Sequence, residues 1–440
     1  MASKRFLSTV ALGAGAAMFL AACSGGGSDD ATAGGGGDGG TSGGGGDVTL
    51  TWWHNSNTDP GKAYYEEVVA DFEAENPGVT IEISALAHQD MLTRLDAAFQ
   101  TGDAPDVFME RGGGELTSHV EAGLVQDLSE VAAEEIEMMG PSIDGWQVDG
   151  ATYALPFSVG VVGFWYNTAL FEEAGITEAP ESMEDLYAAV DALKAADIQP
   201  IAVGAGDKWP AAHYWYYFAL RQCGDEVLAE AAETQDLSDE CFVRAGEDLT
   251  ELVAAEPFNE GFLATPAQSG PTSASGLLAT GQVAMELAGH WEPGVMQGLT
   301  EDNQGLGENT GWFPFPTVEG GDGNPEVPLG GGDAWACSAD APPECLDFIR
   351  YMLSDEVQTG FAELSMGVPT NPAAEGAVAI PALAELVTIR NEAPTVQLYL
   401  DTLFGENAGG AMNDAIALVF AGQGSPQEIV DATQAAITNG

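Results

Sequence analysis

Short apolar runs alternate with amphipathic helical patterns in this chain, and this alternation restricts the fold more than any other feature. Residues 48–54 (VTLTWWH) are predicted to form a strand, residues 62–78 a helix that ends at Asn-Pro-Gly, and residues 79–84 (VTIEIS) a second strand. Residues 88–109 then predict a helix, a turn and a third strand. This β-α-β-α-β order indicates an α/β lobe with a largely parallel sheet.

A second series of the same kind begins near residue 153. Residues 153–167 predict extended segments, residues 182–196 a helix with a serine cap, and residues 200–204 a buried strand. Residues 209–222 predict an aromatic-rich helix, and the last helix begins after Ser425. Because about 390 residues follow the first strand's start, which is enough for two domains, we expect two α/β lobes.

The first 22 residues have the layout of an export signal. Lys4 and Arg5 precede an apolar stretch that reaches Leu20, and this stretch is too short to be a membrane span. The residues LAAC that end at Cys23 resemble a bacterial lipobox, in which the signal is cut before the cysteine and that cysteine carries a lipid. We therefore expect a lipoprotein signal peptide over 1–22. An ordinary signal peptide cut near Ala22 is the alternative.

Glycine dominates the residues that follow. Residues 24–46 contain no apolar side chain larger than alanine, so they cannot build a core of their own. A flexible coil of this length reaches roughly 25 Å. We predict that residues 23–47 are a lipidated cysteine and a Gly-rich tether to the outer face of the cell membrane.

The chain is strongly acidic. It has 69 Asp and Glu against 11 Lys and Arg, which gives a formal net charge of −58. Such a protein repels nucleic acid and anionic lipid, so both are excluded as partners, and a neutral solute is expected rather than an anionic one. The composition fits a saline or acid-tolerant habitat, or a composition bias of the whole lineage.

Four cysteines besides Cys23 are an even number in a chain predicted to be exported, which predicts disulfides. Of the three possible connectivities, the two local pairings, Cys223 with Cys241 and Cys337 with Cys345, need the least coordination. Zinc is the alternative, but the spacing lacks paired short gaps and no histidine is adjacent. No metal or cofactor is expected.

Sequence motifs for catalysis are absent. The chain contains no GxSxG, no GxxxxGK[ST] and no HExxH, and its five histidines are isolated, so each is expected on the surface or in the core. The Gly-rich residues 110–115 lack GxGxxG spacing, and residues 319–326 lack the full EF-hand spacing. A pair of carboxylates for glycoside hydrolysis cannot be read from a sequence, so a surface-anchored glycoside hydrolase is the alternative to a non-enzymatic function.

Nine tryptophans recur near predicted strand or helix ends, beside glycines and polar side chains. A sugar ring has an apolar face that stacks on an indole and a rim of hydroxyls that pair with carboxylates and amides. Taken singly, each tryptophan fits plain core packing better. As a set, they favour a carbohydrate pocket.

Several segments together resemble family 1 extracellular solute-binding proteins, the lipid-anchored receptors of carbohydrate ABC importers and distant relatives of maltose-binding proteins. They span nearly all of the chain after the signal, in the family's order. The segments are the lipobox at Cys23, 72–83 (FEAENPGVTIEI), 99–108 (FQTGDAPDVF), 121–128 (EAGLVQDL), 153–176 (YALPFSVGVVGFWYNTALFEEAGI), 281–291 (GQVAMELAGHW), 329–358 (LGGGDAWACSADAPPECLDFIRYMLSDEVQ) and 366–372 (MGVPTNP).

The resemblance implies an α/β, two-lobed periplasmic-binding-protein-like fold of type II, with a ligand cleft between lobes joined by hinge crossings. It places lobe 1 at 48–156 plus 330–371 and lobe 2 at 157–329 plus 372–440. It also implies a non-enzymatic, monomeric receptor that binds a neutral mono- or oligosaccharide and delivers it to the subunits of a membrane permease.

The family's positions, carried over, imply a set of ligand-binding residues near strand ends. Stacking is expected from the aromatic members, and hydroxyl recognition from the charged members. The set is His54, Asn55, Glu110, Arg111, Lys208, Trp209, Trp291, Asp333 and Trp335. In the first strand, alternation puts Trp52 in phase with Leu50, so Trp52 is expected in the core.

This chain departs from maltose-type receptors in two respects. Those receptors have a stacking aromatic in a late helix, whereas residues 401–415 here offer only Phe404 beside polar Glu406 and Asn407. The two expected disulfides are not a general family feature either, so we interpret them as local stapling.

Overall fold

The computed structural model describes residues 47–439. The predicted signal peptide, the lipidation site Cys23 and nearly all of the predicted tether lie outside these residues. Within them, no helix combines the length and apolar character that crossing a bilayer requires.

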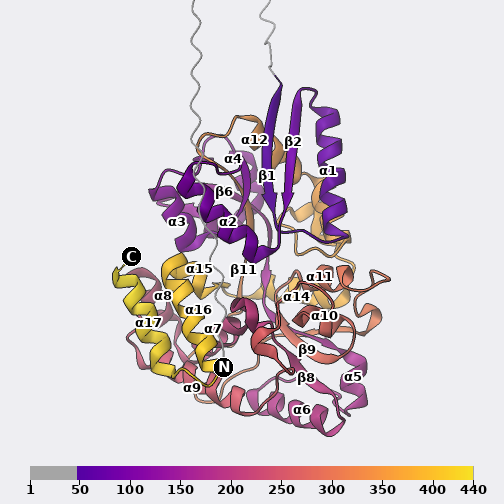
Figure 1. Cartoon of the computed structure of the whole chain (residues 1–440), viewed down its shortest axis with the longest axis vertical. Coiled ribbons are helices and arrows are strands. Elements are labelled where there is room, and N and C mark those ends of the chain that lie inside the picture. Colours follow the sequence, from indigo (N-terminus) through magenta and orange to yellow (C-terminus); the bar gives the residue numbers. More distant parts are fainter. Residues whose placement is uncertain (1–46, 440) are drawn as a thin grey trace, which may run out of the picture. The chain divides into compact units, whose positions relative to one another are not determined.

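A six-stranded sheet forms the centre of the first lobe (Figure 1). Its strands are β1 (Val48–His54), β2 (Val79–Ala85), β3 (Val107–Glu110), β6 (Ala154–Val161), β11 (Leu329–Cys337) and β12 (Gln397–Leu398). β1 pairs in parallel with β2 and β3, as the β-α-β-α-β pattern predicts. β11 runs antiparallel to β3 and β6, so the sheet as a whole is mixed and not largely parallel. The reason is that β11 enters this sheet only after the chain has passed through the second lobe.

Helices cover this sheet and enclose an apolar core. The helices are α1 (Gly61–Glu75), α2 (His88–Thr101), α3 (Gly113–Glu121), α4 (Ala133–Met139), α12 (Glu344–Met352) and α13 (Asp355–Glu363), with the 3₁₀ turn η1 (Gly140–Trp146) and the small hairpin β4 (Gln147–Val148) and β5 (Ala151–Thr152). Trp52 is fully buried in this core against Trp335 and Phe348, at ring-centroid distances of 5.3 and 5.1 Å. Its predicted core position is confirmed.

A four-stranded sheet forms the centre of the second lobe, in the order β10-β7-β9-β8. The strands are β7 (Gly163–Asn167), β8 (Gln199–Ala202), β9 (Val283–Ala288) and β10 (Thr310–Phe313). β9 is parallel to β8 and antiparallel to β7. This second mixed sheet completes the two-lobed α/β arrangement.

Eleven of the described helices surround the second sheet. They are α5 (Thr168–Glu173), α6 (Met183–Ala195), α7 (Trp209–Gln222), α8 (Asp225–Thr234), α9 (Glu240–Ala254), α10 (Ala274–Ala279), α11 (Glu292–Gly298), α14 (Pro381–Glu392), α15 (Leu400–Phe404), α16 (Glu406–Phe420) and α17 (Pro426–Asn439); the 3₁₀ turns are η2 (Ala205–Asp207), η3 (Phe262–Ala264), η4 (Gly307–Asn309) and η5 (Pro372–Ala377). α7 has the bounds that its sequence predicts and is almost entirely buried.

Two paired strands carry the chain between the sheets. β6 belongs to the first sheet. β7 belongs to the second sheet and begins after a single intervening residue. β11 brings the chain back, and its residues 330–332 pair with residues 159–161 of β6. Ser158 also forms a bridge with Pro369, so a third segment lies beside the same strand. Side chains at these crossings therefore lie at the floor between the lobes.

Both predicted disulfides are present. Cys223 at the end of α7 joins Cys241 in α9, and Cys337 at the end of β11 joins Cys345 in α12. Each bridge joins two residues of the same lobe, so each is a local cross-link.

Candidate ligand-binding site

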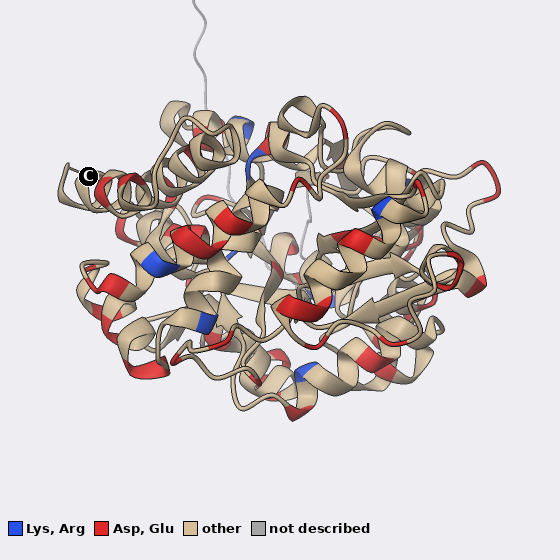
Figure 2. Ribbon diagram, turned by 90° about the horizontal axis from the view of Figure 1, so that it is seen from below, with Lys and Arg blue, Asp and Glu red and all other residues tan. Residues whose placement is uncertain are grey.

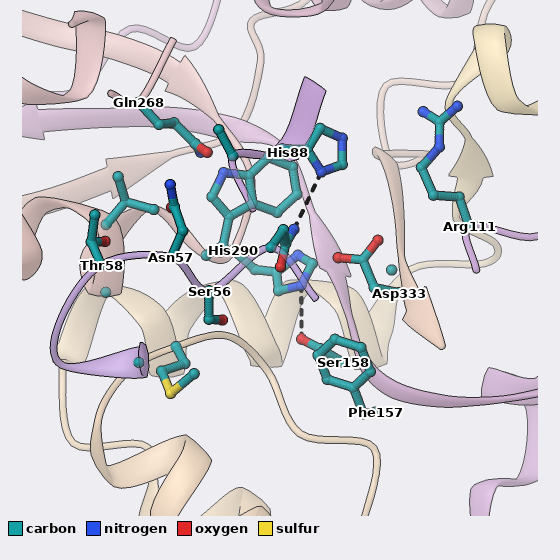
Figure 3. A pocket seen from close by; sticks show the side chains of 18 of the residues that line it. Ser56, Asn57, Thr58, His88, Arg111, Phe157, Ser158, Gln268, His290 and Asp333 are labelled. Carbon is teal, nitrogen blue, oxygen red and sulfur yellow. Dashed lines mark hydrogen bonds between the residues drawn. The ribbon is translucent and has the colours of Figure 1, made fainter. Parts of the chain in front are cut away.

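A cavity of about 190 Å³ lies between the lobes (Figure 3). The first lobe contributes the loop 55–61 that follows β1, together with His88 and Arg111. The second lobe contributes residues of α7, the loop at 268–269 and the turn from β9 into α11. Phe157, Ser158 and Asp333 come from the crossing strands. A ligand in this cavity would therefore touch both lobes and the strands that join them.

Four aromatic side chains form one wall of the cavity. His213 stacks on Tyr399 with ring centroids 5.3 Å apart and an interplanar angle of 18°. Trp209 lies 5.3 Å from His213 and 6.1 Å from Trp291, and Trp291 lies 6.5 Å from Tyr399. Such a wall presents flat apolar faces to a ligand.

Glycines make room for two of these rings. A Cβ atom on Gly289 would lie 2.3 Å from the ring of Trp291, and one on Gly331 would lie 2.8 Å from the ring of Tyr399. Neither position can carry a side chain while the ring keeps its place. The glycine run in "LGGGDAW" and the glycine in "AGHW" therefore shape the aromatic wall.

Several polar groups on the cavity lining have no hydrogen-bond partner among residues 47–439. The ring nitrogens Trp291 Nε1 and His213 Nδ1 and the hydroxyl of Tyr399 are buried and unpaired. Burial raises the pKa of Asp333 to about 7, although nearby Arg111 lowers it. Because a buried polar group without a partner is costly, these groups are suited to hydrogen bonds with a ligand.

His290 joins the second lobe to the crossing segments. Ser158 Oγ donates its one proton to the carbonyl oxygen of Val368 at 3.0 Å, so it accepts from His290 Nε2 at 2.9 Å (Figure 3). Burial, and then the charge of Arg390, lower the pKa of His290 to about 3, so this ring is neutral at physiological pH. The contact fixes the floor of the cavity.

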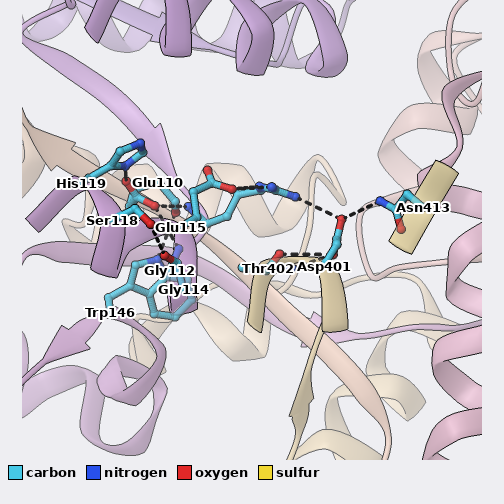
Figure 4. Close-up of polar contacts among 11 residues, drawn as sticks. Glu110, Gly112, Gly114, Glu115, Ser118, His119, Trp146, Asp401, Thr402 and Asn413 are labelled. Carbon is cyan, nitrogen blue, oxygen red and sulfur yellow. Dashed lines mark hydrogen bonds and ion pairs between the residues drawn. The ribbon is translucent and has the colours of Figure 1, made fainter. Parts of the chain in front are cut away.

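Arg111 sits at one end of the cavity within a polar network (Figure 4). Its Nε donates to Glu115 Oε2 at 3.0 Å, and its Nη1 lies 3.7 Å from Asp401 Oδ2. Asp401 also accepts from Asn413 Nδ2 at 3.2 Å. Arg111 belongs to the first lobe, whereas Asp401 and Asn413 belong to α15 and α16, so the network links the two lobes beside the cavity.

A second cavity of about 470 Å³ adjoins the first. Four residues line both cavities: His88, Arg111, Trp209 and Asp401. Elsewhere the second cavity is lined by α2 of the first lobe and by η2 and α16 of the second.

Five of the nine predicted ligand-binding residues line the first cavity. These are Asn55, Arg111, Trp209, Trp291 and Asp333. Lys208 lines only the second cavity, where it forms an ion pair with Asp414. The binding roles of these residues stay a prediction.

The structure places His54 and Trp335 in the core of the first lobe and not in the cavity. The ring of His54 lies 4.3 Å from that of Trp52, tilted by 36°, and burial lowers the pKa of His54 to about 3. It shares the inward face of β1 with Trp52 because strand faces alternate every two residues. Trp335 stacks on Phe157 at 4.2 Å. The register between β11 and β6 is irregular beside Asp333, with Phe157 as the extra residue of β6. Asp333 lines the cavity, whereas Trp335 packs on Phe157 in the core.

Glu110 is also a structural residue. Its carboxylate accepts hydrogen bonds from the backbone N–H groups of Arg111 and Gly112, at 3.0 and 3.2 Å, and pairs with His119 Nδ1 at 2.8 Å. The side chain of Glu110 is fully buried. Glu110 therefore holds the turn after β3 and positions Arg111 (Figure 4).

Sequence reasoning missed several cavity residues. His88, His213 and His290 were expected to be surface or core histidines, and each lines the cavity. Tyr399 precedes the late stretch 401–415, whose Phe404 is buried in the core of the second lobe. Tyr399 therefore supplies an aromatic ring beside a late helix, and it lies two residues before the stretch 401–415 in which the sequence showed only Phe404. No local pattern marked the three histidines.

The structure offers no arrangement of metal ligands in the part of the chain it describes: no three His, Cys, Asp or Glu side chains are placed to hold an ion.

Comparison with known proteins gives the family. The family model described as "Bacterial extracellular solute-binding protein" matches residues 54–359, which is more than half of the chain. A putative binding protein of Brucella abortus is 29% identical over 181 residues, or 40% of this chain, and the match spans only 42% of that relative's length. The diacetylchitobiose binding protein DasA of Streptomyces coelicolor is 24% identical over 379 residues, which cover 80% of this chain and 84% of DasA.

Solved structures agree in fold. A protein from a study of xylan utilization by Caldanaerobius polysaccharolyticus superposes with a TM-score of 0.80 at 25% identity, covering 88% of this chain and 99% of that one. A chitin oligosaccharide binding protein gives a TM-score of 0.80 at 26% identity, covering 89% and 98%. The fold is the two-lobed, type II periplasmic-binding-protein fold that the sequence predicts. With the family match across both lobes, the chain belongs to the bacterial extracellular solute-binding proteins.

Proposed function

We propose that this protein is the extracytoplasmic receptor of an ABC importer and that it binds a neutral mono- or oligosaccharide between its lobes. The observation that carries the proposal is the wall of Trp209, Trp291 and Tyr399 beside the carboxyl group of Asp333. Aromatic faces stack on the apolar face of a sugar ring, and a carboxylate accepts from its hydroxyls. Closure of the lobes then traps the sugar for delivery to the permease.

The charges around the cavity favour a neutral ligand. Asp59, Asp333 and Asp401 line it, and the one cation among its lining residues, Arg111, is already paired with Glu115 and Asp401. Figure 2 shows that acidic residues are spread over the elements in view, with few basic residues between them. An anionic solute would meet uncompensated negative charge at this site.

The names of relatives support the same ligand class. DasA is named for diacetylchitobiose, and a protein of Haloferax volcanii that is 28% identical over 165 residues is named for xylose and arabinose. These names describe those proteins, and the sugar of this chain has to be found by measurement.

Calorimetric titration with a panel of sugars, amino acids and peptides tests the proposal. We expect heat of binding with at least one neutral sugar. Glucose and glucuronate serve as a matched pair within the panel, since they differ by one carboxylate. Heat with amino acids or peptides alone would overturn the sugar assignment, and tighter binding of the acid than of its neutral partner would overturn the neutral class.

A surface glycoside hydrolase is the competing function. The family and the similar structures are binding proteins, which supports a receptor that performs no chemistry. Incubation with the oligosaccharides of the panel, followed by chromatography, separates the two functions. A receptor returns its ligand uncut, and new reducing ends would identify an enzyme.

The proposal includes a monomeric receptor held at the outer face of the membrane by a lipid on Cys23. The lipobox-like sequence before this cysteine supports it. Phase partitioning in a detergent should move the exported protein into the detergent phase, whereas Cys23→Ser should leave it in the aqueous phase. Equal partitioning of the two would rule out the lipid.

We also propose that the lobes move as 48–156 plus 330–371 and 157–329 plus 372–440. The pairing of β6 with β11 supports hinges near these boundaries. Crystal structures with and without the sugar would give the rotation axis.

A further inference from the structure

The two interlobe cavities have a common wall. His88 and Arg111 from the first lobe, and Trp209 and Asp401 from the second, line both of them. The two cavities therefore adjoin at these four residues, at the junction of the lobes.

Trp209 is the aromatic residue of the common wall. Its ring lies 6.3 Å from His88 across the lobes and 6.1 Å from Trp291 within the second lobe. Because the indole lines both cavities, sugar rings on either side of this wall can contact it at the same time.

The second cavity differs from the first in its chemistry. Trp209 and His88, both of the common wall, are its only aromatic lining residues in the described part of the chain. Amide and charged groups such as Asn413, Gln89 and the Lys208–Asp414 pair make up much of the rest. Groups of this kind bind hydroxyls directly or through water, and they select less by shape than a wall of aromatic rings does.

The sizes of the cavities favour a ligand that uses both. Sites for small molecules typically measure about 300–1,000 Å³. The first cavity, at about 190 Å³, is below that range, and the second, at about 470 Å³, is inside it, so a ligand held by the aromatic wall of the first cavity gains room by extending into the second.

We propose that the ligand is an oligosaccharide of at least two rings, with a terminal ring in the first cavity and the chain continuing past Trp209 into the second. This inference rests on the proposed sugar-binding function. The first cavity selects the terminal ring, and the second adds affinity for the rings that follow.

Gly410 offers a way to fill the second cavity alone. It lies in α16, lines the second cavity but not the first, and has open space where a Cβ would point. Leucine at this position should project into the second cavity, and it favours a helix over glycine by about 0.5–1 kcal/mol. Gly376→Leu is the matched control, because Gly376 also has open space around its Cβ position and lines neither cavity.

Titration calorimetry with sugars of increasing length tests the proposal. The probes are N-acetylglucosamine with its β-1,4-linked dimer and trimer, xylose with xylobiose and xylotriose, and galactose with raffinose and stachyose. In the series that binds, we expect the dimer or trimer to bind at least about tenfold more tightly than the monosaccharide, or about 1.4 kcal/mol. Gly410→Leu should remove most of this gain and leave the affinity for the monosaccharide within about twofold. Gly376→Leu should keep the gain.

The remaining outcomes contradict either this inference or the proposed function. Equal affinities for monosaccharide and oligosaccharide would overturn this inference and leave the proposed function standing. A gain that survives in Gly410→Leu, with a melting temperature at or above that of the parent, would place the additional rings elsewhere and also overturn it. Binding of none of these sugars, with heat from another solute class, would overturn the proposed function itself.

Discussion

The indole of Trp291 lies against Gly289 and lines the cavity, with its ring nitrogen unpaired. Replacing Trp291 by alanine should remove a stacking face worth about 1 kcal/mol or more together with one hydrogen-bond donor, so we expect affinity for the sugar to fall about tenfold. Calorimetry measures this. Trp53→Ala is the control, because Trp53 packs on the first lobe away from the cavity. Equal affinities in parent and Trp291→Ala would remove Trp291 from the site.

Asp333 gives the site a pH dependence. Its free pKa is about 7, chiefly because of burial. A sugar hydroxyl donates more strongly to the ionised carboxylate, so binding favours the ionised form and lowers the pKa. Affinity should therefore rise as the pH rises to about 7, then level off, and it should fall as the pH drops below that value. In Asp333→Asn this rise should be absent. A parent whose affinity is flat between pH 5.5 and 8, or an Asn variant that keeps the rise, would contradict the role of Asp333.

The sequence predicts some of these residues well and others not at all, for physical reasons. Asn55 and Arg111 directly follow strands, where the ends of parallel strands meet at one edge of the sheet, so their place in the cavity follows from the element order. His54 could have been assigned to the core by the same period-two rule that assigned Trp52. The inward packing of Trp335 could not be foreseen, because residue type alone does not separate a tryptophan that stacks on a ligand from one that packs in a core.

At the scale of elements, α11 and β9 enclose two carboxyl groups that face one another. Glu292 begins α11 and Glu286 lies in β9, and both are buried. Ser275 Oγ of α10 donates to Glu292 Oε2 at 3.0 Å. Burial raises the pKa of Glu292 to about 8, and burial with the neighbouring Glu292 raises that of Glu286. The pair therefore keeps its protons at neutral pH.

This pair should make stability depend on pH. Folded Glu292 keeps a proton that the unfolded chain releases above its ordinary pKa near 4.5, so its contribution to stability is complete below that pH and is lost as the pH rises towards about 8. In Glu292→Gln the neutral amide cannot ionise. We expect the fall in melting temperature between pH 6 and pH 8.5 to be smaller in the variant than in the parent, as measured by calorimetric scans. Identical falls would show that Glu292 does not titrate in this range.

Elements with local signals are the ones that the sequence predicts. The cap of α6 is formed by Ser182 and Asp185, which exchange hydrogen bonds with each other's backbone N–H groups. Ser425 marks the start of α17, because its backbone N–H and its hydroxyl both donate to the carboxylate of Glu428. The mixed character of the first sheet has no such signal, because β11 begins 219 positions after β3 ends and only tertiary packing decides which way it enters.

At the scale of the whole molecule, one of the close backbone approaches between the lobes is at Gly298. A Cβ on Gly298, the last residue of α11, would lie 2.4 Å from the carbonyl oxygen of Asp59 in the first lobe. Leucine there should hold the lobes apart. We expect Gly298→Leu to weaken sugar binding at least about tenfold, although Gly298 does not line the cavity.

Small-angle X-ray scattering checks the cause of this loss. The parent should become more compact when sugar is added at saturation, and Gly298→Leu should remain more extended. Gly376→Leu should behave like the parent. If Gly298→Leu binds sugar with the parent's affinity, the contact with Asp59 is not part of the closed state.

The two-lobed architecture follows from the sequence because two separate β-α series appear in it, whereas the geometry between the lobes does not. The cavity brings together Asn55, Trp209, Asp333 and Tyr399, which are far apart along the chain. Nothing local in the sequence relates residues from four such distant segments. Only the packing of both lobes on the crossing strands does so.

The pairing of β3 with β11 also has a consequence for how the protein is made. Residues 48–110 are synthesised first, but their sheet is joined on one side by a strand that ends at Cys337. During translation, the first lobe therefore has an unfilled sheet edge until some 220 further residues have followed, and exposed edges of this kind bind other chains. The second lobe's sheet, by contrast, uses residues from one continuous stretch of the chain. The second sheet is thus complete before β11 is made, although the helices α14 to α17 of that lobe follow β11, and the open edge of the first sheet has to stay protected until β11 arrives.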